Sequence, residues 1–313
     1  MRTVSLMRGA LLLYALLAAV SLMTGCGGVS TGTPSSPAPI QPSPINASQF
    51  GHVILVVEEN HSFSDVIGNS EMPYLNSLAT QYGLATQYYA NTHPSIGNYF
   101  ELTTGIVITD DETYVGPVPE TDDNVVRELL AIGRTWKVYA ESLPSIGYTG
   151  EDVYPYSKRH NPFVFFTDVL NSPTQLNNVV PFTQFAADLA ASRLPNFSFI
   201  VPNLLNDAHD GSLTDADTWL SQNIGPLVSN PVFQNDGLLI VLFDESEFTD
   251  LQNLGGHVPA VLVSTQSKKG YQSTTFYQHQ STLRLILKGL GGTRFPGDAA
   301  TAPDMSEFFS TAK

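Results

Sequence analysis

A run of five apolar residues, 53–57 (VILVV), constrains the fold of this 313-residue chain more than any other stretch. The run has no polar interruption and stops at Glu58, Glu59, Asn60 and His61. A continuous apolar run of this length is typical of a strand that is buried on both faces, as in a sheet covered by helices. In open α/β sheets, ligands bind at the carboxyl ends of such strands, where these polar residues stand. A core strand that simply runs into a solvated loop is the alternative that this stretch leaves open.

Strand-like and helix-like segments alternate along the rest of the chain. Helices are predicted over residues 73–82, 98–104, 121–132, 182–193, 211–220 and 281–290, and further strands over 136–140, 197–201, 238–243 and 259–263. Alternation of this kind indicates an α/β fold with a mostly parallel central sheet and helices on both faces. Because no repeat and no second linker appears, residues 49–313 are predicted to form a single domain.

The amino terminus has the features of an export signal. Arg2 and Arg8 are followed by the apolar stretch 9–22 and by the sequence Met-Thr-Gly-Cys, which ends at Cys26. Residues 1–26 are therefore predicted to be a lipoprotein signal peptide that resembles a bacterial lipobox, with Cys26 as the lipidated residue. Simple secretion and a transmembrane anchor are the alternatives, although the apolar stretch is short for a full span. Residues 27–48, rich in Gly, Ser, Thr and Pro, are predicted to be a flexible tether to the bacterial cell envelope, facing the periplasm or the exterior.

Composition excludes several classes of function. Cys26 is the only cysteine, so the chain can form no internal disulfide and has no further thiol for catalysis or metal binding. The net charge is −15, and removal of Arg2 and Arg8 makes it −17. This charge argues against nucleic acid as a partner and against a polybasic membrane face, so contact with the membrane is expected through the lipid anchor only. A bound metal ion would still allow an acidic protein to hold phosphate.

Carboxylate and amide groups follow two of the predicted strands. Glu59 and Asn60 stand at the end of the first, and Asp244 and Glu245 follow the strand over 238–243. Parallel strands bring such ends to one edge of the sheet, and oxygen ligands of this kind suit a divalent cation whose identity the sequence does not specify. Charges at the mouth of a buried strand also need a partner to offset their desolvation. The alternative is that these are surface carboxylates that cap the strand ends.

A hydroxyl that could act as a nucleophile lies in residues 93–99 (HPSIGNY). Ser95 precedes the predicted helix over 98–104, whose backbone N–H groups would face an anion. A serine hydroxyl becomes reactive when a base or a metal lowers its pKa. Ser95 could instead only cap that helix.

Histidines provide candidates for proton transfer and phosphate contact. Asp207, His209 and Asp210 follow the strand over 197–201, and His160 and His279 lie elsewhere. Histidine titrates near neutral pH, which suits it to proton donation. An ordinary Asp-Gly turn at 210–211 and structural histidines are the alternatives.

Seven stretches, taken in order, resemble the bacterial phosphoesterase family that contains acid phosphatases and phospholipases C, within the alkaline phosphatase-like superfamily. They span residues 52–287 and read VILVVEENHSF, NTHPSIGNYFELTTG, WKVYAESLP, KRHNPFVFF, LPNFSFIVPNLLNDAHDGS, LLIVLFDES and YQHQSTLRLIL. Two departures stand out. The acidic residue that usually follows the ENxSF motif corresponds only to Asp65, displaced by Ser64, and the loop after Asp244 is short. The chain leaves no room for the extra carboxyl-terminal domain of the longer phospholipases, which disfavours lipid substrates.

The resemblance implies roles for individual residues. It makes Glu59, Asn60, Asp244 and Glu245 metal ligands and Ser95 the nucleophile held by the metal. Asn98, three residues after Ser95, becomes a phosphate contact. The remaining residues are implied as phosphate or leaving-group contacts, namely His93, His160, His209 and His279. Asp207 and Asp210 are implied as substrate contacts. The alternative is that these two aspartates form a second metal position together with His209 or His279.

These inferences together predict a metal-dependent phosphoric ester hydrolase. Ser95 would attack the phosphoryl group of a small phosphorylated substrate, His209 or His279 would protonate the leaving alcohol, and water would hydrolyse the phosphoserine. An acid-phosphatase-like phosphomonoesterase is the expected activity. A phosphodiesterase or phospholipase C on the same scaffold is one alternative. A non-catalytic, anion-binding surface lipoprotein is the other.

Overall fold

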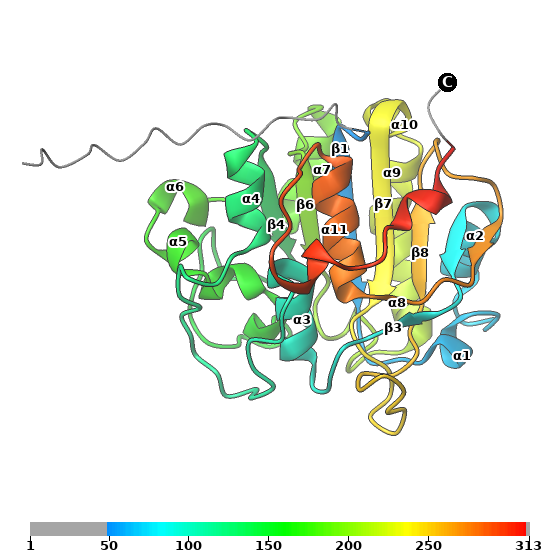
Figure 1. The fold of residues 1–313 in the computed structure, drawn as a ribbon, viewed down its shortest axis with the longest axis horizontal. Helices are drawn as coiled ribbons and strands as arrows, with labels where there is room; N and C mark the ends of the chain where they lie inside the picture. Colours follow the sequence, from blue (N-terminus) through cyan, green and yellow to red (C-terminus); the bar gives the residue numbers. More distant parts are fainter. Residues whose placement is uncertain (1–48, 311–313) are drawn as a thin grey trace, which may run out of the picture. The chain divides into compact units, whose positions relative to one another are not determined.

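Strand β1 (His52–Glu58) lies inside an eight-stranded sheet formed within residues 49–310, the part of the chain that this computed structural model describes (Figure 1). The strand order is β5-β4-β6-β1-β7-β8-β2-β9. β1 pairs in parallel with β6 on one side and with β7 on the other. Residues 53–57 are fully buried, so the predicted strand with two covered faces is confirmed.

The strands are β1 (His52–Glu58), β2 (Gly83–Ala85), β3 (Tyr88–Tyr89), β4 (Trp136–Ala140), β5 (Val179–Pro181), β6 (Phe197–Val201), β7 (Gly237–Phe243), β8 (Ala260–Val263), β9 (Tyr271–Ser273) and β10 (Tyr277–Gln278). The α-helices are α1 (Phe63–Val66), α2 (Pro73–Gln81), α3 (Ser95–Thr104), α4 (Val125–Ala131), α5 (Thr167–Leu170), α6 (Pro173–Leu176), α7 (Thr183–Ala190), α8 (Leu213–Trp219), α9 (Gly225–Val228), α10 (Pro231–Asp236) and α11 (His279–Gly289). A π-helical segment, Leu220–Ile224, joins α8 to α9. Short 3-10 turns are η1 (Lys158–His160), η2 (Pro162–Phe165), η4 (Gly297–Ala300) and η5 (Met305–Phe308).

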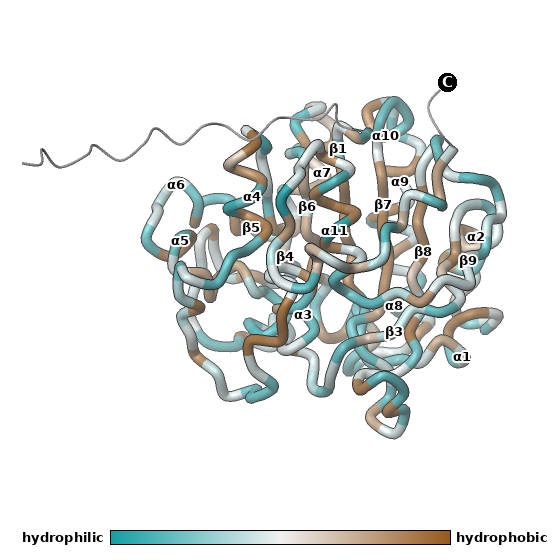
Figure 2. Tube along the Cα trace, viewed as in Figure 1, coloured by the Kyte–Doolittle hydropathy of each residue, from teal (hydrophilic) through white to brown (hydrophobic). Residues whose placement is uncertain are grey.

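Helices form a layer on each face of the sheet. α11 contacts both α3 and α4 and lies in front of the central strands in Figure 1. On the opposite face, α2 contacts α8 and also contacts the segment Leu220–Ile224, which follows α8 in the chain. Figure 2 shows apolar residues along the central strands, while the loops at the lower edge are mostly hydrophilic. This arrangement leaves the two edges of the sheet as the places where polar groups can gather.

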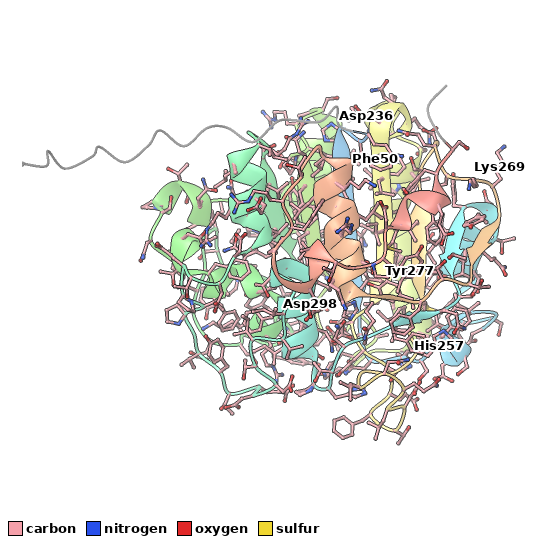
Figure 3. The ribbon with its side chains drawn as sticks, viewed as in Figure 1. Phe50, Asp236, His257, Lys269, Tyr277 and Asp298 are labelled. Atoms are coloured by element: carbon pink, nitrogen blue, oxygen red, sulfur yellow. The ribbon has the colours of Figure 1, made fainter. Side chains whose placement is uncertain are left out.

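Strand direction decides which loops share an edge. β8 runs antiparallel to both β7 and β2, whereas the other pairings within the large sheet are parallel. Ser264, which follows β8, therefore lies at the amino edge, and His257, which precedes β8, lies near the carboxyl edge. Figure 3 shows His257 near the lower edge, far from Phe50 and Asp236 at the upper edge.

Two predicted helices begin at residues other than expected, and three short strands of the large sheet were not predicted. The helix expected over 98–104 begins three residues earlier, at Ser95. The helix expected over 121–132 begins at Val125, because Asn124 caps it by accepting a hydrogen bond from the Arg127 backbone and the acidic residues before it form a turn. The short strands β2, β5 and β9 were not predicted, since runs of three residues carry no readable alternation.

Within residues 49–310, every helix is too short or too polar to cross a bilayer. The predicted signal peptide, Cys26 and the tether over 27–48 lie outside the described residues.

A buried carboxyl on α3 gives the fold a pH-dependent stability. Glu101 is 2% exposed, and burial, with the nearby charge of Asp298, raises its pKa from 4.5 to about 7. Between those values the folded chain binds a proton that the unfolded chain has lost, so stability falls as the pH rises. We expect Glu101→Gln to raise the free energy of unfolding at pH 8 by up to about 3 kcal/mol, with little effect at pH 4. Urea unfolding at both pH values measures this effect, and the exposed substitution Glu71→Gln, which should change neither value, is the control.

Candidate active site

Three neighbouring strands deliver their polar ends to one place. β6, β1 and β7 are adjacent and parallel, so their carboxyl ends coincide. The backbone ladder continues past the strands: Glu59 N donates to the Asp207 carbonyl at 2.8 Å, and Asp244 N donates to the Glu58 carbonyl at 3.0 Å. The loops that carry Glu59, Asp207 and Asp244 are therefore fixed relative to one another by main-chain hydrogen bonds.

Ser95 reaches this edge from the first residue of α3. Its hydroxyl lies 3.1 Å from Glu59 Oε2, 3.1 Å from Glu245 Oε1 and 3.4 Å from Asn60 Oδ1. The residue at the helix cap is Pro94, so Ser95 does not act as the cap that was the alternative. We call Glu59, Asn60, Ser95, Asp244 and Glu245 the oxygen cluster.

The backbone at Asn60 is specialised for this cluster. Its φ of 56° lies in the left-handed region, which a residue other than glycine adopts only where the surroundings impose it. Its backbone N–H donates to Asp244 Oδ1 at 3.4 Å. Its side-chain oxygen faces the cluster, and a half turn of the amide would instead let the nitrogen donate to Glu59 and Glu245 at 3.0 and 3.1 Å. The amide can thus present either a donor to carboxylates or a ligand oxygen to a cation.

Negative charge in the oxygen cluster is poorly compensated by the protein. Burial, followed by the charges of Asp244 and Asp207, raises the pKa of Glu59. Burial and the charge of Glu245 raise the pKa of Asp244. Asp244 Oδ2 is buried and has no hydrogen-bond partner among residues 49–310. Since an unpaired buried acceptor is costly, this donor set fits a divalent cation with oxygen ligands.

His160 adds a second set of groups beside Glu59. Its Nδ1 lies 3.3 Å from Glu59 Oε1 and 3.6 Å from Asp207 Oδ2, the latter too far for a hydrogen bond. One ligand atom from each of Glu59, His160 and Asp207 lies within 4.8 Å of the others. Burial, helped by nearby His209 and Arg159, lowers the pKa of His160 to about 3, so the ring is neutral. Burial raises the pKa of Asp207 to about 8.

His93 and His209 lie near different members of the site: His93 contacts Glu245, and His209 lies beside His160. His93 Nδ1 contacts Glu245 Oε2 at 2.7 Å, and Nε2 contacts the Asp250 carbonyl at 3.1 Å. Burial by itself would lower the pKa of His93, but these hydrogen bonds outweigh burial and raise that pKa. His209 is more open: its side chain is 30% exposed, and its Nδ1 contacts Asp210 at 2.7 Å. Its ring lies 5.8 Å from the His160 ring, between that histidine and solvent.

Two predicted contacts occupy different positions from those expected. His279 is fully buried, with Nδ1 bonded to the Tyr88 hydroxyl at 3.1 Å and Nε2 to the Asp244 carbonyl at 2.5 Å. Burial lowers its pKa to about 4. It supports the Asp244 backbone from behind and does not face a leaving group.

Asn98 bonds the backbone of residues 91–92 and keeps one N–H of its side-chain amide for a further acceptor. Its side-chain oxygen accepts from the backbone N–H groups of Asn91 and Thr92 at 2.9 and 3.2 Å, and its nitrogen donates to the Thr92 carbonyl at 2.8 Å. Asp210 points toward His209, and not to Asp207 as the predicted second metal position required. The acidic partner of Asp207 is Glu59.

Tyr99 contacts two residues of the candidate site, and the sequence interpretation did not identify it. Its hydroxyl donates to Glu59 Oε1, and its ring stacks on His160 with centroids 5.0 Å apart and planes 5° apart. Tyr99 follows Ser95 by four residues on α3, so both side chains share one helix face. That spacing was the available signal.

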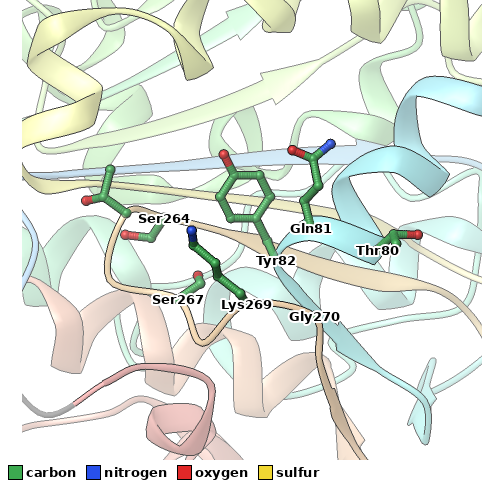
Figure 4. A pocket seen from close by; sticks show the side chains of 8 residues that line it. Thr80, Gln81, Tyr82, Ser264, Ser267, Lys269 and Gly270 are labelled. Carbon is green, nitrogen blue, oxygen red and sulfur yellow. The ribbon is translucent and has the colours of Figure 1, made fainter.

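A cavity lies away from this site. It has a volume of about 620 Å³ and is lined mainly by polar residues at the end of α2 and in the segment after β8, including Tyr82, Ser264, Ser267 and Lys269 (Figure 4). It opens at the amino edge of the sheet, opposite the oxygen cluster.

Similarities to known proteins agree with this chemistry. Residues 69–291 match the family model described as the Phosphoesterase family. The chain is 35% identical over 266 residues to a phosphatidylinositol-3-phosphatase of Mycobacterium tuberculosis, and the match covers 83% of each protein. It is 34% identical over 274 residues to an acid phosphatase of Aspergillus fumigatus, but spans only 59% of that protein. A phospholipase C A of Mycobacterium tuberculosis matches at 27% identity over 34% of this chain.

Solved structures show where the fold belongs. A protein of the alkaline phosphatase superfamily from Vibrio parahaemolyticus aligns with a TM-score of 0.60 at 13% identity, covering 88% of this chain and 76% of that one. A phosphonate monoester hydrolase from Silicibacter pomeroyi aligns with a TM-score of 0.58 at 13% identity, with coverage of 84% and 77%. The predicted alkaline phosphatase-like α/β fold is confirmed.

Proposed function

Because this chain belongs to the phosphoesterase family and is a phosphoric ester hydrolase, we propose that it hydrolyses phosphomonoesters, with Ser95 as nucleophile and a divalent cation as cofactor. The observation that carries the proposal is the position of the Ser95 hydroxyl, 3.1 Å from one oxygen of each of two buried glutamates. The monoester preference is supported by matches to phosphatases over more than four-fifths of the chain, against about one third for a phospholipase C.

The oxygen cluster would hold the cation through Glu59, Asn60, Asp244 and Glu245, with Ser95 beside them. A divalent cation bound there would favour the ionised hydroxyl and neutralise charge on phosphoryl oxygens. The unpartnered oxygen of Asp244 and the inward-facing amide of Asn60 support this assignment. Glu59, His160 and Asp207 would face the phosphoryl group or a second ion.

The remaining steps fall to side chains of this chain. Ser95 Oγ attacks phosphorus, the alcohol leaves, and water hydrolyses the phosphoserine. Ser95 opens a ten-residue helix, whose free backbone N–H groups favour an anion at that end. His209, whose side chain is 30% exposed and bonded to Asp210, would protonate the alcohol.

Metal analysis combined with paired ester assays tests this proposal. The purified protein should contain a divalent metal and should hydrolyse a chromogenic phosphomonoester at least about tenfold faster than the matching diester, and a chelator should abolish both activities. A higher rate on the diester would favour the phosphodiesterase alternative. Metal or phosphate binding without turnover would favour a non-catalytic lipoprotein.

We expect Tyr99→Phe to weaken the site without unfolding the protein. The substitution removes the hydroxyl that holds Glu59 but keeps the ring that stacks on His160. Loss of such an outer partner typically costs about 10- to 100-fold in metal affinity or activity. Titration with a competing chelator measures the affinity. The control is Tyr139→Phe, which removes a buried hydroxyl from Asp188, a carboxylate outside the site, and should leave metal affinity unchanged.

The envelope location is a further part of the proposal. Cys26 would carry the lipid, and residues 27–48 would tether the domain to a membrane. Labelled palmitate should be incorporated by cells expressing the full chain and lost in the Cys26→Ser variant. Equal labelling of both would contradict the anchor.

A further inference from the structure

The loop formed by residues 246–256 carries large apolar side chains that project into solvent. It leads directly from Glu245 to His257 and protrudes at the lower edge of the molecule, in yellow, in Figure 1, with apolar segments coloured brown in Figure 2. Phe248, Leu251 and Leu254 are 73%, 65% and 74% exposed. Exposed apolar surface of this extent beside a site typically marks a binding surface.

Internal hydrogen bonds hold this loop in one shape. Ser246 Oγ donates to the carbonyls of Asp250 and Gly255, at 3.0 and 3.2 Å. Gly256 has a φ of +85°, and a Cβ there would lie 1.7 Å from Ser246 Oγ, so the closing turn requires glycine. Asp250 Oδ2 accepts from the His257 backbone at 3.0 Å. A pre-ordered loop loses little entropy when it binds a ligand.

The loop is joined to the oxygen cluster through His93. The Phe248 ring lies 5.2 Å from the His93 ring, and His93 contacts both Glu245 Oε2 and the Asp250 carbonyl. Only one side chain therefore separates Phe248 from a carboxylate next to Ser95.

The charged residues of this loop restrict the kind of chemical group that it can bind. Residues 246–256 (SEFTDLQNLGG) include Glu247 and Asp250 and no Lys or Arg. A strongly anionic group would be repelled, whereas an uncharged apolar group would cover the exposed side chains. Resting on the proposed function, we propose that this loop receives the apolar alcohol of the substrate and so makes the enzyme selective for phosphomonoesters of apolar alcohols.

Two monomeric esters and one double variant test the proposal. The substrates are hexyl phosphate and glycerol phosphate, each below the concentration at which it aggregates, with the metal-loaded enzyme. We expect wild-type kcat/KM to favour hexyl phosphate by at least about tenfold. The variant Leu251→Ser/Leu254→Ser should lower that preference about 5- to 30-fold, mainly through the KM for hexyl phosphate. The control variant Val115→Ser/Leu130→Ser, also exposed but outside the loop, should keep the preference.

The outcomes separate this proposal from the proposed function. If wild-type enzyme hydrolyses both esters without preference, or if the loop variant keeps the preference, the loop has no such role and the phosphatase assignment stands. A loop variant that loses both activities in proportion would show a purely structural role and would also overturn the proposal. If wild-type enzyme hydrolyses neither ester, the phosphomonoesterase function itself fails.

Discussion

Ser95→Ala should lower kcat for a chromogenic phosphomonoester by about 10³- to 10⁵-fold while leaving the fold intact. The substitution removes the one hydroxyl that lies within 3.1 Å of both Glu59 and Glu245, and alanine keeps the helical backbone of α3. Because the effect is on bond formation, KM should change far less than kcat. Steady-state kinetics of the metal-loaded protein measures both.

A matched serine provides the control. Ser281 on α11 is also buried, and its hydroxyl has no hydrogen-bond partner in the described part of the chain, so Ser281→Ala should leave kcat within about twofold. Rapid acid quench should trap phosphate on the wild-type chain and not on Ser95→Ala. Near-normal turnover by Ser95→Ala would show that another group attacks phosphorus.

Asp244→Asn should abolish tight metal binding and lower activity by at least about 10³-fold, yet it should stabilise the metal-free protein. Burial and the neighbouring charge of Glu245 raise the pKa of Asp244, so at neutral pH its charge opposes folding when no cation is present. Removing that charge should raise the free energy of unfolding of the metal-free protein by about 1–3 kcal/mol. Metal-loaded wild type should be more stable than either metal-free form, because binding to the folded state adds stability.

Calorimetry with and without chelator, with metal analysis of the same samples, checks the direction of each change in the free energy of unfolding. Asp217→Asn is the control for the charge change, because that buried carboxylate accepts from the Tyr74 and Leu75 backbones at 2.8 Å each. It should destabilise the protein by about 1–2 kcal/mol and leave metal content unchanged. A metal-free Asp244→Asn protein less stable than metal-free wild type would mean that the oxygen cluster is not under electrostatic strain.

The apolar runs determine the central strands of the sheet. The mostly apolar runs at 53–57, 136–140, 197–201 and 238–243 form β1, β4, β6 and β7, because strands of this composition are buried between two helical layers. Because these strands are parallel, the polar residues that follow them lie at the same edge of the sheet. For this reason Glu59, Asn60, Asp244 and Glu245 could be grouped from the sequence alone.

Tertiary structure decided which polar groups face that site. His279 and His209 are equally plausible as proton donors in the sequence, but one is sealed behind Asp244 and the other stands open beside Asp210. Asn98 has the spacing of a substrate contact, and the structure shows that its amide oxygen and one of its two amide hydrogens bond the backbone of residues 91–92. Tyr99 joins Glu59 to His160 only because α3 turns that face toward the sheet. A sequence records which groups are available along one strand or helix, whereas the partners of a side chain depend on contacts between elements far apart in the chain.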